Sequence, residues 1–279
     1  MKTDEAAAAP SVTAAANRLA RASSSGVACR PVADLIGPSD IALAYAVQQV
    51  TTERRLTAGA RLIGRKIGLT SAAVQAQIGV DRPDFGALFD DMRYADGELV
   101  PYQRLLQPKA EGEVAFLLGR DILDASNPTE VRAAVHLAYP AVEIVDSRIE
   151  NWRIGITDTV ADNASSGVFV IGDHGRPLDE FEPARVRMVM RRDGEVVSKG
   201  SGQDCLGDPL HALTWLARTA IEFGSPLRSG DLVLSGALGP MVTAGPGDVF
   251  EVSIEPLGTV TAHFSDNPGP AGRAGKDDG

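Results

Sequence analysis

The sequence predicts an α+β protein in which strands outnumber helices. Beyond residue 60, short apolar runs separated by Gly, Pro and Asp are typical of strands. Three segments carry helix-starting residues or helical spacing. Asp193-Gly194, between two of the apolar runs, indicates a two-residue hairpin, because both turn positions tolerate positive φ. We expect an N-terminal helical segment at 1–60, a β-rich main domain at 61–265 and a disordered tail at 266–279.

The first 60 residues predict helices that serve as scaffold. Residues 1–30 are rich in Ala and Ser, and Ser23-Ser24-Ser25-Gly26 interrupts them, so we expect a weakly held helix followed by a loop. From Ser39 to Arg55, apolar residues recur near helical spacing after a Ser-Asp start, which predicts an amphipathic helix.

Nine segments of the main domain have the composition and length of strands. They are Glu98–Val100, Glu113–Leu118, Ala141–Val145, Val168–Ile171, Val186–Arg191, Glu195–Ser198, Asp231–Leu234, Val249–Ile254 and Thr259–Phe264. Leu257-Gly258 predicts a looser turn between the last two. The β-rich part therefore extends almost to residue 265.

Two further helices have clear starting signals. Asn127-Pro128 places a cap and a proline before a helix over Val131–Leu137, and Asp208-Pro209 does the same before Leu210–Phe223. Gly224 then ends the second helix.

The composition excludes several classes of protein. The 27 Lys and Arg residues are scattered among 37 acids, giving a net charge of −10, which argues against a nucleic-acid partner. No run approaches the roughly 18 apolar residues of a membrane span. The acids near Met1 do not suit a secretory signal, so we expect a cytoplasmic protein. Cys29 and Cys205 are too few for a disulfide framework or a cysteine zinc site.

The most informative short motif is Glu111-Gly112-Glu113, which leads directly into an apolar strand. Because side chains alternate along a strand, both carboxylates lie on one face, roughly 6 to 7 Å apart at Cα. At that separation two carboxylates can converge on one cation. Without a cation they would repel each other.

Glu143 is a lone carboxylate in the middle of another apolar strand, and a buried charge there needs a partner. Three carboxylates without a nearby His or Cys would make an all-oxygen site, which suits Mg²⁺, Mn²⁺ or Ca²⁺ and suits Zn²⁺ poorly. The alternative is that Glu111 and Glu113 face solvent on an edge strand and that Glu143 pairs with Arg148 or Arg153. Spacing alone leaves both interpretations open.

Longer strings carry a resemblance to a known family. They are GRKIGLTS at 64–71, VDRPDFG at 80–86, LFDDM at 88–92, DTVADNASSG at 158–167 and LVLSGALGPM at 232–241. These strings resemble the 2-keto-4-pentenoate hydratase (2-hydroxypenta-2,4-dienoate hydratase) family, a branch of the fumarylacetoacetate hydrolase superfamily. The likeness covers roughly residues 30–265.

The resemblance implies a fold, an activity and an assembly. The fold would be the mixed β-roll of the fumarylacetoacetate hydrolase C-terminal-domain type, with residues 61–265 as the catalytic domain. The activity would be the metal-dependent addition of water to 2-hydroxypenta-2,4-dienoate or a close analogue, giving a 4-hydroxy-2-oxo acid in aromatic-compound catabolism. The chain would be a homo-oligomer, a pentamer or a decamer.

The resemblance also implies the residues of the site. Glu111, Glu113 and Glu143 would bind Mg²⁺ or Mn²⁺, and Lys66 and Asp84 would be catalytic. A cation beside the 2-oxo group stabilises the enolate where its charge develops. Lys66 would compensate for the carboxylates or act as an acid or base.

Asp84 would activate the water or shuttle a proton. Alternatively, the Asp84 carboxylate bonds backbone amides in a turn. The alternative for Lys66 is that it is a surface lysine without a catalytic role. Asp162, Asn163, Ser165 and Ser166 precede an apolar strand and would bind substrate, or else form a capped turn. Gly200-Ser201-Gly202 lacks the third glycine of a nucleotide-binding loop.

The histidines bear on the reaction type. They are His136, His174, His211 and His263. Carbon–carbon hydrolases of the superfamily resemble one another in that they use a His-Glu dyad on an N-terminal lid helix. No such dyad is found in this sequence, and no His lies near residues 66–84. Hydrolysis is therefore disfavoured. His136 and His211 fall within predicted helices, where packing or surface roles are expected.

Three rival functions remain open from the sequence. A 2-oxo-3-hexenedioate decarboxylase would share the metal glutamates and the lysine but would need a second group that binds an anion. A metal-binding structural partner of such an enzyme is a second alternative, which the presence of Lys66 and Asp84 disfavours. A biosynthetic relative that uses the same enolate chemistry on a larger substrate is the third.

Overall fold

The computed structural model describes residues 9–71, 75, 80 and 82–267. From residue 268 onward, the predicted disordered tail lies outside the described residues. The helices used below are α2 (Pro10–Ser25), α3 (Ala33–Ile36), α4 (Ile41–Thr57), α6 (Pro128–Ala134), α7 (Ile156–Ala161), α8 (Pro209–Glu222) and the 3₁₀ turn η4 (Asn163–Ser165).

The strands form two sheets. The larger has the order β2-β1-β10-β5-β6-β7-β3, with β11 also pairing with β5, and the smaller has the order β4-β13-β12-β8-β9. The larger sheet contains β1 (Leu62–Gly68), β2 (Asp84–Phe89), β3 (Arg93–Ala95), β5 (Pro108–Leu118), β6 (Val135–Asp146), β7 (Ser166–Ile171), β10 (Leu232–Ala237) and β11 (Val242–Thr243). The smaller contains β4 (Leu99–Val100), β8 (Arg187–Arg192), β9 (Glu195–Ser201), β12 (Val249–Glu255) and β13 (Gly258–Phe264).

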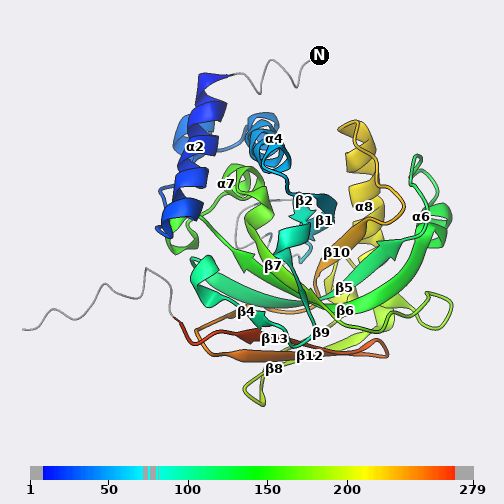
Figure 1. The fold of residues 1–279 in the computed structure, drawn as a ribbon. Coiled ribbons are helices and arrows are strands. Elements are labelled where there is room, and N and C mark those ends of the chain that lie inside the picture. The colour runs from blue at the N-terminus through cyan, green and yellow to red at the C-terminus, as the bar shows by residue number, and fades with distance from the viewer. Residues whose placement is uncertain (1–8, 72–74, 76–79, 81, 268–279) are drawn as a thin grey trace, which may run out of the picture.

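Figure 1 shows the curved larger sheet between two different layers. Helices α2, α4 and α7 lie on one side of it, and the smaller sheet lies on the other. The main apolar core includes Val114 and Val142 of the larger sheet with Met188 and Val252 of the smaller. A second apolar cluster joins the N-terminal helices to α7, for example Val12 to Val160. The N-terminal segment is thus packed onto the body that holds the site.

The α+β, strand-rich prediction is confirmed, and several elements lie close to their predicted positions. Helix α4 is capped by Asp40, whose carboxylate accepts a hydrogen bond from the Leu43 amide. The hairpin between β8 and β9 turns at Asp193-Gly194, with φ of 52° and 87°. Helix α2 ends at Ser25 and is followed by the capping residue Gly26, where φ is 68°.

Other expectations were wrong in informative ways. Strands β1 and β2 and helix α7 were not predicted from the residue pattern. The helix expected over 131–137 ends at Ala134, because the chain joins the sheet at Val135, which pairs with Leu118. His136 therefore lies exposed on strand β6 rather than in a helix, whereas His211 is in helix α8 as expected.

Among the described residues, no helix combines the length and apolar character needed to cross a membrane.

Candidate active site

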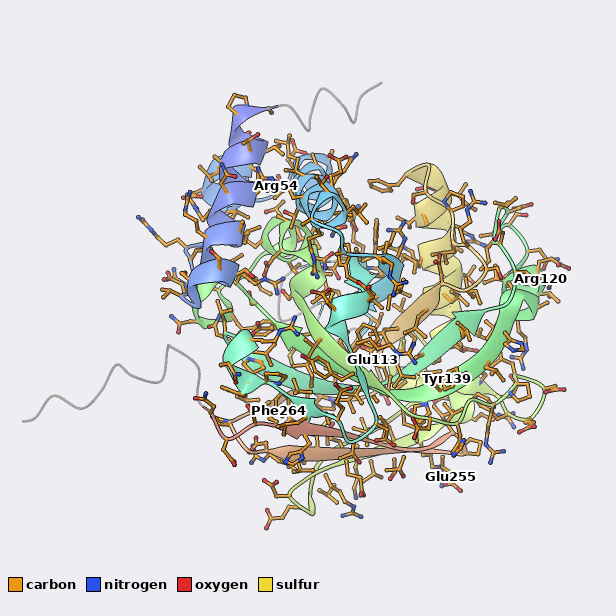
Figure 2. The ribbon with its side chains drawn as sticks, viewed as in Figure 1. Arg54, Glu113, Arg120, Tyr139, Glu255 and Phe264 are labelled. Atoms are coloured by element: carbon orange, nitrogen blue, oxygen red, sulfur yellow. The ribbon has the colours of Figure 1, made fainter. Side chains whose placement is uncertain are left out.

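The three glutamates converge at the middle of the larger sheet. Glu111 and Glu113 lie on β5, and Glu143 on β6 faces Glu111 directly in the strand register. One carboxylate oxygen from each lies within 4.8 Å of the others. Figure 2 shows Glu113 near the centre of the molecule.

The alternative in which both glutamates face solvent on an edge strand is wrong, because β5 is an interior strand. Glu113 is 0% exposed, and Glu111 is half-buried. The interpretation of Glu143 as a partner of Arg148 or Arg153 is also wrong. Glu143 instead forms an ion pair with Lys66. Arg148 Nε lies 2.5 Å from Asp162 Oδ1, and Arg153 Nη1 lies 3.8 Å from Glu150 Oε1.

Lys66 is buried on β1, and the surface-lysine alternative is therefore wrong. Its ammonium Nζ lies 3.2 Å from Glu143 Oε1 and donates a hydrogen bond to the Ala164 carbonyl at 2.9 Å. Lys66 pairs with Gly86 across β1 and β2, and Gly68 pairs with Asp84. Period two then directs Lys66 and Asp84 to the same face of the sheet.

Asp84 is the first residue of β2 and is 1% exposed. Its Oδ2 accepts a hydrogen bond from the Thr159 hydroxyl at 3.0 Å, and its Oδ1 is buried without a partner among the described residues. The alternative, a carboxylate that bonds backbone amides in a turn, does not fit a side chain held in this way. A Cβ at position 68 would lie 2.2 Å from Asp84 Oδ1, so only glycine leaves room for this carboxylate.

Burial raises the pKa values of all these carboxyl groups. For Glu111 burial and the charge of Glu143 outweigh Lys66 and raise the pKa to about 7. Burial also raises the pKa values of Glu113, Glu143 and Asp84, although Lys66 opposes each shift. Burial alone would lower the pKa of Lys66, but Glu143 and the other carboxylates raise it, so the ammonium form is favoured. Within the described part of the chain, the buried ammonium of Lys66 thus interacts with all four carboxyl groups.

The residues present fit a divalent cation. Glu113 Oε2 accepts a hydrogen bond from the Gly236 amide at 2.8 Å, but Glu113 Oε1 and Glu143 Oε2 receive none from the described residues. Buried carboxylate oxygens that lack donors need another positive partner. Converging carboxylates without His or Cys are the ligand set of hard cations. Glu111, Glu113 and Glu143 are the residues that would hold the ion.

The segment that carries four predicted substrate-binding residues borders this site. Asn163, Ala164 and Ser165 of η4 have φ of 56°, 52° and 52°, an arrangement that non-glycine residues adopt at a cost and that often accompanies active sites. The Ala164 carbonyl accepts the hydrogen bond from Lys66. The turn therefore shapes one wall of the site with its backbone.

The structure gives the four side chains of this segment different surroundings. Asp162 forms an ion pair with Arg148. The side-chain amide of Asn163 accepts a hydrogen bond from the Ala87 N–H at 2.7 Å and donates one to the Ala87 carbonyl at 2.9 Å. Ser165 Oγ lies 3.4 Å from Thr159 Oγ1, and Ser166 Oγ is buried without a partner among the described residues. The hydroxyl groups of Ser165 and Ser166 can thus still form hydrogen bonds with a ligand. The side chains of Asp162 and Asn163 are instead already bonded to other groups of the protein.

Sequence reasoning did not single out three groups that contact the site residues: the Thr159 hydroxyl, the Gly236 amide and the Ala164 carbonyl. All three lie within the strings that carried the resemblance. Two act through their backbone, which side-chain patterns do not reveal.

Comparison with known families gives the site its context. The model described as "Fumarylacetoacetate (FAA) hydrolase C-terminal" matches residues 68–265. The chain belongs to this family. The expected mixed β-roll with N-terminal helices is thereby confirmed.

Curated relatives of the chain carry hydratase names. "TodF product hydratase" of Pseudomonas putida is 55% identical over 91% of this chain and 95% of its own length. "2-keto-4-pentenoate hydratase" of Paraburkholderia xenovorans is 52% identical over 91% of this chain and 94% of its own length. "2-hydroxyhexa-2,4-dienoate hydratase" of Comamonas testosteroni is 43% identical over 80% of this chain and 86% of its own length.

Solved structures show a similar fold and a divalent cation. The 4-oxalocrotonate decarboxylase of Pseudomonas putida G7, complexed with magnesium and adipate, has a TM-score of 0.87 and 33% identity over 91% of this chain and 97% of its own. The fumarylpyruvate hydrolase of Pseudomonas aeruginosa, complexed with Mn²⁺ and pyruvate, has a TM-score of 0.60 over 73% of this chain and 89% of its own. At 16% identity it supports the fold alone. The carboxylate cluster and the likeness to the magnesium-bound decarboxylase together support a divalent cation site.

Proposed function

We propose that the chain is a hydro-lyase that adds water to 2-hydroxypenta-2,4-dienoate or a close analogue, giving a 4-hydroxy-2-oxo acid in aromatic-compound catabolism. The observation that carries this proposal is the 55% identity, over 91% of the chain, to a relative named a hydratase. The geometry of the buried carboxylates and Lys66 is consistent with chemistry that builds negative charge on a substrate.

We assign the cation, as Mg²⁺ or Mn²⁺, to Glu111, Glu113 and Glu143. When bound, it supplies Lewis-acid polarisation of the 2-oxo and carboxylate oxygens of the substrate. Its charge also offsets part of the repulsion among carboxylates that Lys66 alone leaves uncompensated.

Lys66 and Asp84 have separate tasks in this proposal. The Lys66 ammonium, held by Glu143 and the Ala164 carbonyl, keeps a positive charge beside the developing enolate or the substrate carboxylate. Asp84 Oδ1, which has no hydrogen-bond partner in the described part of the chain, can accept or return a proton during ketonisation of the dienol or addition of water. Ser165 and Ser166 would contact the substrate, while Asp162 and Asn163 would hold the turn that presents them.

The second candidate is a decarboxylase, favoured by the likeness to the 4-oxalocrotonate decarboxylase structure. The two activities are separated by measuring turnover of 2-hydroxypenta-2,4-dienoate, 2-hydroxyhexa-2,4-dienoate and 2-oxo-3-hexenedioate, each with and without Mg²⁺. We expect cation-dependent hydration of one or both dienoates. Exclusive release of CO₂ from the dicarboxylate would overturn the proposal.

The metal-binding structural partner and the biosynthetic relative predict different results. A structural partner would bind Mn²⁺ but turn over none of these substrates. A biosynthetic relative would act on a larger 2-oxo acid and only weakly on the dienoates. We also propose a cytoplasmic location and assembly as a homo-oligomer, a pentamer or a decamer.

A further inference from the structure

Thr159 makes a single well-defined contact with the proposed acid–base residue. It lies on α7 and is 4% exposed, and its hydroxyl donates a hydrogen bond to Asp84 Oδ2 at 3.0 Å. Because a hydroxyl has one proton to donate, the Thr159 hydroxyl that donates to Asp84 has no second proton for another acceptor. A hydrogen bond to one carboxylate oxygen fixes the rotation of the whole group.

The consequence is that Asp84 presents its other oxygen in one direction. Oδ1 lies over Gly68, where even a Cβ would come within 2.2 Å of it and 3.3 Å of Lys66 Nζ. If the carboxylate rotated about its Cβ–Cγ bond, Oδ2 would leave Thr159. The Thr159 hydrogen bond therefore keeps Oδ1, which has no hydrogen-bond partner among the described residues, over Gly68.

Helix α7 is itself tied to its surroundings on both sides of Thr159. Asp158 Oδ1 accepts hydrogen bonds from the Val32 and Ala33 amides at 2.8 and 2.9 Å, which anchors α7 to α3. Gln48 of α4 donates to the carbonyls of Val160 and Phe85, both at 2.9 Å. Gln48 thus clamps α7 to β2 at the residues that follow Thr159 and Asp84.

We propose that Thr159 is a positioning residue for the reaction. It orients the Asp84 carboxylate so that Oδ1 faces the substrate, and the N-terminal helices hold Thr159 in place through Asp158 and Gln48. The inference rests on the proposed function, because it takes Asp84 to be the group that moves the proton. It assigns the helical segment a part in catalysis without contact to the substrate.

Replacement of Thr159 by Val and by Ser tests the proposal, with Thr157→Val as the matched control. Thr157 lies on the same helix, is 0% exposed, and its hydroxyl has no partner among the described residues. The Val substitution is nearly isosteric at both positions. The measurements are kcat and KM for 2-hydroxypenta-2,4-dienoate, Mn²⁺ affinity by calorimetry, Tm, and the crystallographic orientation of Asp84.

We expect Thr159→Val to lower kcat by about tenfold to a hundredfold, because small misplacements of a reacting group cost rates of that order. KM, Mn²⁺ affinity and Tm should change little, and Asp84 should be rotated in the crystal. Thr159→Ser should restore kcat to within a few-fold, and Thr157→Val should behave like the wild type.

Several results would overturn the inference: full kcat in Thr159→Val, an equal loss in Thr159→Ser, or an unrotated Asp84 in the Val variant. If the wild type fails to hydrate the dienoate, the proposed function fails. The crystallographic comparison of the three variants still decides whether Thr159 orients Asp84.

Discussion

At the scale of single residues, the site is a group of like charges that the fold holds together against their repulsion. Glu113 and Glu143 are almost fully buried and have a raised pKa, and Lys66 is the buried cation that offsets them. Retaining unpaired acids in an interior costs free energy unless a ligand compensates. That cost is the physical basis for expecting tight coupling between cation binding, proton release and activity.

Lys66→Ala should lower kcat/KM for the dienoate by at least about 100-fold, because one group that stabilises developing charge contributes roughly that much. Loss of the ammonium also leaves Glu143 beside Asp84 without its buried counter-charge. Lys199→Ala, at an exposed position on β9, serves as the control. An unchanged cation-dependent activity in Lys66→Ala would remove Lys66 from the mechanism.

Cation affinity should fall as the pH is lowered through about 7. In the cation-free protein the pKa of Glu111 is raised to about 7, so below that pH the cation must displace a proton. Between pH 8 and pH 6 the single proton on Glu111 should weaken the apparent Mn²⁺ affinity about tenfold. Titration calorimetry in two buffers of different ionisation enthalpy measures both the affinity and the protons released.

The control for this pH effect is a pair of glutamine variants. Glu111→Gln should bind Mn²⁺ more weakly and lose part of the pH slope, whereas Glu251→Gln, exposed on β12, should do neither. A flat affinity between pH 6 and pH 8 in the wild type would contradict the role of Glu111.

At the scale of elements, successive side chains of β5 point to the two opposite faces of the larger sheet. Glu111 and Glu113 face the site, while Gly112 between them faces the smaller sheet. A Cβ at position 112 would lie 2.9 Å from Val252 Cγ1 and 3.0 Å from Met188 Cγ. Close packing of the two sheets therefore requires glycine between Glu111 and Glu113.

Gly112→Val should destabilise the protein by about 1–3 kcal/mol through overpacking, which corresponds to a fall in Tm of several degrees. Cation affinity should also weaken, because the strand that carries both glutamates must shift. Gly155→Ala is the control, since its φ is −102° and the nearest atom to the new Cβ would be Asp158 Oδ2 at 3.7 Å. Equal Tm values for both variants would show that the sheets tolerate the added volume.

Sequence patterns predicted helices, strands and turns well where neighbouring residues carry the signal. They predicted strands poorly where a segment becomes a strand only by pairing with other strands. The capped start of α4 and the Asp193-Gly194 turn are encoded by neighbouring residues. Strand β1 contains Gly64, Arg65 and Lys66, a poor strand composition, and forms because β2 and β10 pair with it on either side. The strands that carry Lys66 and Asp84 were thus not predicted from the residue pattern.

At the scale of the whole molecule, the N-terminal helices and helix α7 share one cluster of apolar side chains, including Val12, Val47 and Val160. The division at residue 60 stays a proposal about domains, but the packing makes the helical segment part of the support for α7. Destabilising that segment is therefore expected to affect the site as well as the fold.

The homo-oligomer should have a mass of about five or ten times the 29.3 kDa of one chain. Light scattering after size exclusion, repeated at two ionic strengths and at two protein concentrations, measures the mass directly. A single species with the mass of one chain at all conditions would contradict the assembly we propose.

The sequence by itself determined the chemistry available to this protein. The two-residue spacing of Glu111 and Glu113, and the isolation of Glu143 in an apolar strand, follow from local order and restrict the site to oxygen ligands. Only the tertiary structure decided that these groups meet, that Lys66 rather than an arginine neutralises Glu143, and that the Thr159 hydroxyl donates a hydrogen bond to Asp84. The reason is physical: contacts between residues 66 and 143, or 84 and 159, depend on sheet order and register, which short-range patterns do not specify.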